Sequence, residues 1–358
     1  MKKIGLLTIH DTLNFGSLFQ TYGLYKAIES LGQDITLIDY KNDAIADREK
    51  TYRLNQVKSI KDLYKFVFHH SFLEQKHKNF WEFINHNMKT SEVYNKDTII
   101  EANKVFDTFA VGSDIVWGMI ITGYDFNYML QFADDSKRKI SFSSSVGTRW
   151  PSEYDEIVKK NLCRFDHICV REQLAQKWIN EVLPEKQIVE TCDPTMLWDR
   201  GTLWGEFAKK ELVANGDYLL IYLKTDDNRT VKDAIAYGKE HHLPVYNINY
   251  NHSIPGVKNI HPTDVYEWIS WFAFASCIFT ASYHGIMFSL FFEKPFFWYS
   301  RANSARTESL SKELGISNRE GIFENIKADV KMDYTKINQR IEKKRGQSWA
   351  QLKQMLCE

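Results

Sequence analysis

Residues 3–40 read KIGLLTIHDTLNFGSLFQTYGLYKAIESLGQDITLIDY. The apolar runs at 3–9 and 35–40 each predict a buried strand. Between them, apolar residues recur at spacings of three and four from Leu18 to Leu31, which predicts a helix that ends at Gly32. A strand, a helix and a strand in so short a stretch form a βαβ unit, whose two strands are parallel and whose crossover is right-handed. The chain therefore begins as an α/β protein with a parallel sheet.

The same alternation continues along the chain. Further strands are predicted at 106–112, 139–145, 167–170, 218–224, 243–249, 277–281 and 295–300, and further helices at about 229–241, 263–275 and 285–293. A stretch with a proline, a glycine and a helical pattern at 193–217 separates two strand-rich halves. We therefore expect an α/β fold of two Rossmann-like domains facing a central cleft, where open α/β sheets bind ligands.

The domain boundaries follow from this pattern. We expect an N-terminal domain at 1–199, a C-terminal domain at 200–332 and a C-terminal helix at 333–358 that could cross back to the first domain. The segment 48–90 is rich in lysine, histidine and aromatic residues and is predicted to be an inserted helical excursion. Over 48–78 it has eight Lys/Arg against three acidic residues.

Composition excludes several classes of protein. The 358 residues include 46 Lys+Arg and 46 Asp+Glu, so the formal net charge is zero, whereas a general nucleic-acid binder needs a basic surface. The five cysteines have no CxxC spacing, which argues against a disulfide framework or a zinc ribbon and favours a reducing compartment. The eleven histidines form no HExxH or comparable spacing, so no metal site is predicted.

One stretch has the length of a membrane span. Residues 269–292 contain no Asp, Glu, Lys or Arg, but their centre at 280–285 is polar, which a bilayer core would penalise. We divide the stretch into a helix, a strand and a second helix. The N-terminal apolar run is too short for a secretory signal, and a cytoplasmic protein is expected.

Two segments at predicted strand ends of the first half could carry chemistry. The loop that contains Asn14, Gly16 and Ser17 enters a helix, whose exposed N–H groups favour an anion or a polyol; an ordinary turn with Asn14 or Ser17 as helix cap is equally compatible. The second segment is Gly112-Ser113-Asp114 with Trp117. Asp114 could be a general base or a helix cap, and Trp117 a stacking face for a sugar or a core residue.

Three further segments carry candidate charged groups. Arg171 follows a short apolar strand, where it could hold a carboxylate or phosphate or pair with Glu172. His284 lies between a buried strand and a buried helix, beside Gly285, and such apolar surroundings require a titratable group to be well bonded or used. The polar stretch 301–319 contains three arginines and should lie near His284.

Together these segments resemble the polysaccharide pyruvyl transferase family, in order and over most of the chain. The motifs are Asn14-Phe-Gly-Ser-Leu-Phe-Gln20, Gly112-Ser-Asp114 with Trp117, Val170-Arg-Glu172, Asp193-Pro194, Ser282-Tyr-His-Gly285 leading to Lys294-Pro-Phe296, and Arg306 with Arg319. The resemblance implies a GT-B-like fold and transfer of the enolpyruvyl group of phosphoenolpyruvate to a hexose, as a pyruvate ketal. Better-studied members have an arginine where this chain has Ser282, so it is similar to a branch with Ser-aromatic-His-Gly.

The resemblance also implies roles for individual residues. The expected catalytic residues are His284 as acid and Asp114 as base, with no cofactor, no metal and phosphoenolpyruvate as co-substrate. Donor-binding residues are expected to be Arg171, Ser282, Tyr283, Gly285, Arg306 and Arg319. Acceptor-binding residues are expected to be Asn14, Gly16, Ser17, Gly112, Ser113, Trp117 and Ser145.

Two alternatives remain open from the sequence. A GT-B glycosyltransferase that uses a nucleotide sugar would share the cleft, and a non-catalytic glycan-binding relative would account for Ser282. The resemblance implies an acceptor that is built on a lipid carrier, so the protein is expected to act at the inner face of the cytoplasmic membrane. Peripheral contacts could come from 48–90 and from Arg340, Lys343, Lys344 and Arg345, or these could be solvated faces.

Overall fold

The computed structural model describes residues 2–49, 57, 59–223, 227–248, 253–300 and 305–357. The chain folds into two compact units, Met1–Leu197 with Lys344–Glu358 and Trp198–Lys343. The boundary lies close to the predicted one at residue 199. The second unit, however, includes the first part of the C-terminal helix, which was predicted to begin a separate segment at residue 333.

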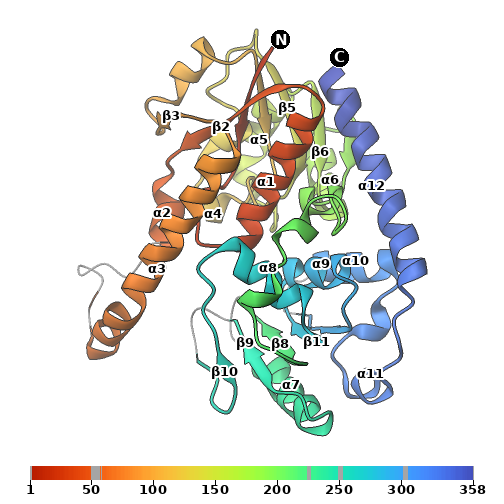
Figure 1. Ribbon diagram of the computed structural model, residues 1–358. Helices are drawn as coiled ribbons and strands as arrows, with labels where there is room; N and C mark the ends of the chain where they lie inside the picture. The colour runs from red at the N-terminus through yellow and green to blue at the C-terminus, as the bar shows by residue number, and fades with distance from the viewer. Residues whose placement is uncertain are drawn as a thin grey trace. The chain divides into compact units, whose positions relative to one another are not determined.

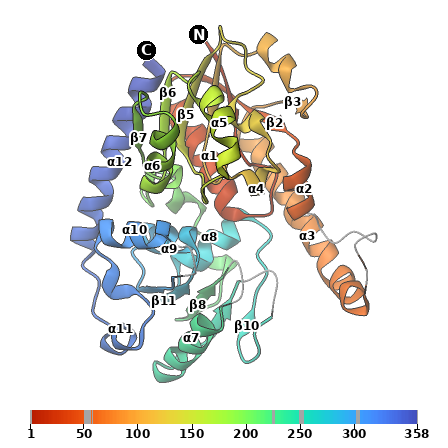
Figure 2. The ribbon, with the colours of Figure 1, turned by 180° about the vertical axis from the view of Figure 1, so that it is seen from behind.

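In the described part of the chain, the first unit contains a parallel sheet of seven strands in the order β3-β2-β1-β4-β5-β6-β7. The strands are β1 (Lys3–Leu7), β2 (Asp34–Tyr40), β3 (Thr90–Tyr94), β4 (Thr108–Val111), β5 (Arg138–Ser144), β6 (His167–Val170) and β7 (Ile188–Glu190). The helices of this part of the chain are α1 (Phe15–Ser30), α2 (Asp43–Glu49), α3 (Ile60–Asn87), α4 (Met119–Thr122), α5 (Asp155–Leu162) and α6 (Gln173–Val182). Helices α1 and α3 lie in front of the sheet in Figure 1, and α5 and α6 in Figure 2, so both faces are covered.

The strand register brings several loops to one edge of this sheet. Leu7 at the end of β1 pairs with Val111 at the end of β4, and Ser144 at the end of β5 pairs with Val170 at the end of β6. Because all of these strands are parallel, their carboxyl ends lie along the same edge. The loops that follow them carry most of the polar residues singled out in the first half of the sequence.

Helix α1 is buried on nearly every side. Thirteen of its sixteen residues are buried, which explains its apolar composition and its small polar side chains. Gly23 permits a close packing partner, because a Cβ at this position would lie 2.8 Å from the carbonyl oxygen of Pro194. Pro194 begins the short 3-10 helix η5 (Pro194–Leu197). Helix α1 and η5 are therefore packed closely against each other.

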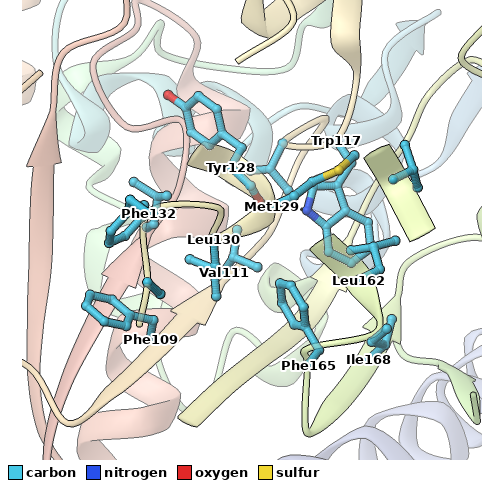
Figure 3. Close-up of a cluster of buried hydrophobic side chains, with 14 of the residues drawn as sticks. Phe109, Val111, Trp117, Tyr128, Met129, Leu130, Phe132, Leu162, Phe165 and Ile168 are labelled. Carbon is cyan, nitrogen blue, oxygen red and sulfur yellow. Dashed lines mark hydrogen bonds between the residues drawn. The ribbon is translucent and has the colours of Figure 1, made fainter. Parts of the chain in front are cut away.

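The core on the other face of the sheet contains Trp117 (Figure 3). Its side chain is 1% exposed, its indole N–H donates to the carbonyl of Tyr128 at 2.8 Å, and Phe165 meets it edge to face at 6.0 Å. The prediction that Trp117 stacks on an acceptor sugar is therefore wrong. An indole in this position instead anchors the loop after β4 to the core.

The segment 48–90 was predicted to be an inserted helical excursion, but it is part of the sheet's own βαβ pattern. Its helix α3 leads from β2 to β3, which pairs in parallel with β2 at the sheet edge, so α3 is the crossover of a further βαβ unit. Residues 50–56 and 58 lie outside the described residues. The polar strand β3 was not predicted, and neither were the three-residue strand β7 and the two-residue strand β10, which are too short to give a pattern in the sequence.

The second unit has its own parallel sheet, in which the described residues form five strands in the order β10-β9-β8-β11-β12. These strands are β8 (Leu219–Tyr222), β9 (Val245–Asn247), β10 (Lys258–Asn259), β11 (Cys277–Thr280) and β12 (Phe296–Trp298). Its helices within the described ranges are α7 (Asn228–Glu240), α8 (Val265–Ala273), α9 (Tyr283–Phe291), α10 (Ala305–Leu314) and α11 (Phe323–Ala328).

The uncharged stretch 269–292 folds as the sequence predicts. It is divided among α8, the inner strand β11 and α9, all of which are buried. None of the helices in the described residues is both long and apolar enough to cross a membrane.

Helix α12 (Tyr334–Cys357) belongs to both units, with its second half in the first unit. There Leu352 and Met355 are fully buried, Arg345 donates to the carbonyl of Met196 at 2.7 Å, and Lys344 pairs with Glu190 at 3.0 Å. Arg345 and Lys344 were two of the basic residues named as candidate membrane contacts, with solvated faces as the alternative. Their contacts within the first unit make them poor candidates for that role.

The burial of Leu352 leads to a stability prediction. Leu352→Ala should lower the free energy of unfolding by about 2–5 kcal/mol, because it removes a fully buried side chain and leaves a cavity. Chemical denaturation followed by circular dichroism would measure this. Lys353→Ala on the exposed face of the same helix is the control and should change stability little. Equal stabilities of the two variants would contradict the packing of α12 into the first unit.

Candidate functional site

The loop after β1 is fixed by its own hydrogen bonds. Asn14 caps α1, its side-chain oxygen accepting from the N–H of Gly16 at 3.1 Å, and its amide donates to Ser17 Oγ at 3.1 Å. Of the two interpretations of this loop, the structure shows the one in which Asn14 is the helix cap. Ser17 Oγ in turn donates to Asp114 Oδ2 at 2.5 Å, which joins the loop after β1 to the loop after β4.

The loop after β4 has a geometry that only its particular residues allow. Gly112 has a φ of 140°, and a Cβ there would lie 2.0 Å from the carbonyl oxygen of Phe142. Ser113 is fully buried. Its N–H donates to Gln20 Oε1 and its hydroxyl donates to the carbonyl of Ser143, each at 2.9 Å. These two residues shape the loop. Both donors of Ser113 are used inside the protein, so its side chain is not placed to contact an acceptor, whereas the acceptor contact of Gly112 stays a prediction.

Asp114 is the residue of this loop whose side chain remains partly exposed to solvent. It has a left-handed backbone conformation with a φ of 59°, which is uncommon for a non-glycine residue and is typical of functional positions. Its carboxylate is held by Ser17 on one side and lies 3.7 Å from an Nη of Arg171 on the other. The side chain is 16% exposed, so solvent still reaches it.

Arg171 lies among three carboxylates of its own unit. Its guanidinium bonds Asp193 at 2.8 Å and lies 3.7 Å from both Asp114 and Glu172, while its side chain is 3% exposed. A buried guanidinium requires such compensation, and the planar fork of arginine can face several acceptors at once. The sequence suggested a choice between a ligand contact and a pair with Glu172, and the structure contains that pair within a larger cluster.

Glu172 and Asp193 are held in turn by the surrounding backbone. One oxygen of Glu172 accepts from Ser145 Oγ at 2.7 Å and from the N–H of Val146 at 3.1 Å, and Asp193 Oδ1 accepts from the N–H and hydroxyl of Thr195. Ser145 is fully buried, so its predicted contact with the acceptor is also wrong. Asp193, three residues beyond the end of β7, was missed as a site residue, although the Asp193-Pro194 motif was noted in the resemblance.

In the described contacts, three carboxylates lie around the guanidinium of Arg171. The hydroxyls of a sugar could donate to such a carboxylate. Asp114 is the most exposed of the three, since Glu172 is 8% and Asp193 0% exposed. The Asp114 carboxylate is therefore suited to accept from a hydroxyl group.

The His284 segment forms the start of α9 in the second unit. Ser282 is the N-cap, with its hydroxyl accepting from the N–H of Gly285 at 3.4 Å. Gly285 is required at this point, because a Cβ would lie 2.2 Å from Thr280 Oγ1. His284 is buried to 8% exposure at the carboxyl end of β11, and the partly exposed ring of Tyr283 meets it edge to face at 5.5 Å.

Two arginines of the second unit, Arg306 and Arg319, were predicted to bind the donor, and the structure describes the side chain of Arg319. Arg319 is 1% exposed, donates to the carbonyls of Phe296 and Val330, pairs with Asp329 at 3.1 Å and lies over the ring of Phe297. It is part of the core, and its predicted contact with the donor is wrong. Arg306 lies in α10, but its side chain and residues 301–304 are outside the described residues.

Cysteine chemistry is not available at the buried thiols. Burial raises the pKa of Cys169, Cys192 and Cys277 to about 12, so these thiols stay protonated near neutral pH. Among the residues that the structure describes, no group of three or more His, Cys, Asp or Glu side chains is arranged to hold a metal ion. The candidate chemistry of the described side chains rests on Asp114 and His284.

Comparison with solved structures shows the fold. The UDP-GlcNAc 2-epimerase of Methanocaldococcus jannaschii aligns over 93% of this chain and 92% of its own, with a TM-score of 0.52 and 14% identity. The enzyme of Neisseria meningitidis bound to UDP-GlcNAc aligns over 97% and 94%, with a TM-score of 0.53 and 9% identity. These likenesses establish a GT-B-type fold and confirm the predicted fold class.

Comparison of the sequence gives the family. No curated protein matches the chain. The family described as polysaccharide pyruvyl transferase matches residues 14–303, which include the loop of Asn14, the cluster around Arg171 and the His284 segment. The resemblance noted in the sequence is thereby confirmed, and this chain belongs to the polysaccharide pyruvyl transferase family.

Proposed function

We propose that this protein transfers the enolpyruvyl group of phosphoenolpyruvate to a hexose of a polysaccharide precursor and closes it as a pyruvate ketal. The family match supports the reaction class. The geometric observation that carries the proposal is Asp114, a partly exposed carboxylate held by Ser17 and Arg171 at a strand end. That arrangement is suited to accept a proton from a sugar hydroxyl.

The reaction uses two hydroxyls of the acceptor and releases inorganic phosphate. His284 in its protonated form gives a proton to the methylene carbon of phosphoenolpyruvate, and the first hydroxyl adds to the neighbouring carbon as its proton passes to Asp114. The second hydroxyl then attacks the same carbon, and the bond to the phosphate oxygen breaks. The proton of the second hydroxyl leaves with the phosphate. The proton taken up by Asp114 is released to solvent and His284 takes one up, which replaces the proton that His284 gave to the new methyl group.

In this proposal Arg171 is a positioning residue. Its guanidinium is occupied by Asp114, Glu172 and Asp193, so it fixes the direction of the Asp114 carboxylate rather than holding the donor. Ser282 and Gly285 set the start of α9, which determines where the His284 ring lies. The negative charge of phosphoenolpyruvate then falls to other groups, of which Arg306 is our candidate.

A nucleotide-sugar reaction is the competing activity. The solved neighbours include UDP-GlcNAc 2-epimerases, but fold likeness at such low identity does not carry an activity. Thermal-shift measurements separate the two readings, since stabilisation by phosphoenolpyruvate and not by UDP or GDP supports the pyruvyltransferase. Stabilisation by UDP or GDP alone would favour the glycosyltransferase.

The role of His284 as the acid gives the first kinetic prediction. His284→Ala should lower phosphate release from phosphoenolpyruvate, in the presence of a hexose acceptor, by about 10²–10⁴-fold. The assay compares a panel of hexoses and their glycosides. His86→Ala, at an exposed histidine near the end of α3, is the control and should retain full activity. Retained activity of a folded His284→Ala protein would remove His284 from the mechanism.

The positioning role of Arg171 gives the second kinetic prediction. Lysine keeps the charge but cannot face three carboxylates in a plane, so Arg171→Lys should lower kcat by about 100-fold through misplacement of Asp114. The KM for phosphoenolpyruvate should stay nearly unchanged. Arg149→Lys, which replaces a partly buried partner of Asp155, is the matched control. A large rise in the KM for phosphoenolpyruvate with kcat preserved would instead show that Arg171 holds the donor.

A further inference from the structure

A second polar cluster lies at the carboxyl ends of β1 and β2, apart from the residues discussed above. Its members come from the loop after β1, the end of β2 and the helix α3. They are His10, Asp11, Asp39, Lys41, His77 and Trp81. We call this group the β1/β2 cluster.

Asp11 is the centre of the β1/β2 cluster. Its carboxylate accepts from Lys41 Nζ at 2.8 Å and from the indole N–H of Trp81 at 3.1 Å, and it lies 3.0 Å from His77 Nε2. The Trp81 indole N–H also lies 3.2 Å from His77 Nε2. Burial alone would raise the pKa of Asp11, but the hydrogen bonds of His77 and Lys41 and the nearby positive charges hold it well below its usual value. The carboxylate therefore stays ionised and available as an acceptor at physiological pH.

Lys41 links Asp11 to the rest of the cluster. Its ammonium lies 3.0 Å from Asp39 and 4.3 Å from the centre of the Trp81 ring. Asp39 also lies 3.3 Å from His10 Nε2, and the other ring nitrogen of His10 lies 3.2 Å from the carbonyl of Thr8. Each side chain therefore has a defined direction before any ligand arrives, which lowers the entropic cost of binding.

A small pocket opens beside Asp11 and Lys41. Its volume is about 40 Å³, and its lining includes Tyr40, Asn42 and Tyr128. The back wall is rigid, because Tyr40 donates to Asp125, Asn42 donates to the same carboxylate at 2.9 Å, and the rings of Tyr40 and Tyr128 pack edge to face. The pocket is large enough for a few waters or for a hydroxymethyl group.

The charges of the β1/β2 cluster define the class of ligand. Two carboxylates face one ammonium and two imidazoles, so neither a strongly anionic nor a strongly cationic ligand is favoured. The side chains of Asp11, Lys41 and His77 are 24%, 37% and 49% exposed, so solutes reach them. A carboxylate acceptor, an ammonium donor and an indole together match the hydroxyls and the apolar C–H face of a neutral pyranose.

We propose that the β1/β2 cluster is the subsite that binds the acceptor hexose, with Asp11 and Lys41 on its hydroxyls and Trp81 beside its ring. This inference rests on the proposed function and names where its acceptor is recognised. The sheet order supports it, because β2, β1 and β4 are neighbours and Asp114 follows β4 on the same sheet edge. The loop after β1, residues 8–14, leads from one place to the other, with Asp11 in its middle and Ser17 in the first turn of α1.

The competing explanation is a clamp that fixes α3 to the sheet. His77 and Trp81 are residues of α3, so their contacts with Asp11 do hold this helix. A clamp and a binding site differ in one observable, which is the response of the Trp81 indole to a sugar. Because that N–H donates to Asp11, a ligand hydroxyl at the carboxylate must change its chemical shift.

The experiment titrates the full-length protein with methyl pyranosides of glucose, galactose, mannose and N-acetylglucosamine at millimolar concentrations. Indole N–H resonances are followed by NMR, and Trp81→Phe assigns the Trp81 signal. We expect a saturable shift of that signal with at least one pyranoside, and no shift of Trp178, a half-buried tryptophan on α6. Asp11→Asn should weaken binding about tenfold or more, while Asp97→Asn in an exposed turn should not.

Each outcome decides between the explanations. An unchanged Trp81 signal with all four pyranosides, or equal affinity of the Asp11→Asn and wild-type proteins, would overturn the subsite and leave the clamp. Turnover measurements separate this from the proposed function: phosphate release with an unchanged acceptor KM in Asp11→Asn would refute the subsite alone. Pyranoside binding at Trp81 without any turnover of phosphoenolpyruvate would refute the transferase alone.

Discussion

The guanidinium of Arg171 among Asp114, Glu172 and Asp193 is the interaction on which the first unit depends. Each carboxylate comes from a different segment of the chain. Asp114 lies in the loop after β4, Glu172 at the start of α6, and Asp193 directly before η5. Through Ser17 the cluster reaches α1, and through Ser145 it reaches the loop after β5. One buried cation thus sets the relative positions of most of the loops at the sheet edge.

Such a cluster is a costly way to hold loops together, since burying four charged groups requires each to be compensated. Apolar side chains of similar volume could stabilise the unit at least as well. Ionic compensation instead gives direction, because every carboxylate oxygen must face a particular donor. The left-handed backbone at Asp114 and the glycine at 112 are part of the same arrangement, since both are needed to bring the carboxylate to Ser17 and Arg171.

The β1/β2 cluster shows the same principle with a different balance. There Asp11 and Asp39 share one ammonium, and the groups remain partly exposed. Both clusters lie at the carboxyl ends of strands of one sheet, and both contain a carboxylate that solvent reaches, Asp114 in one and Asp11 in the other. Such carboxylates can accept hydrogen bonds from hydroxyl groups.

The sequence by itself determined the α/β class, the parallel strands of both units, the family and the positions of Asp114 and His284 at strand ends, because apolar periodicity and short motifs are local signals. It missed β3, β7 and β10, which are short and take their stability from neighbouring strands. It also could not separate residues that meet a ligand from residues that shape a loop. Trp117, Ser113, Ser145 and Arg319 looked like binding groups, yet each is buried with a partner of its own. Only the tertiary structure decided this, since burial and hydrogen-bond partners depend on contacts between segments that are far apart in the chain.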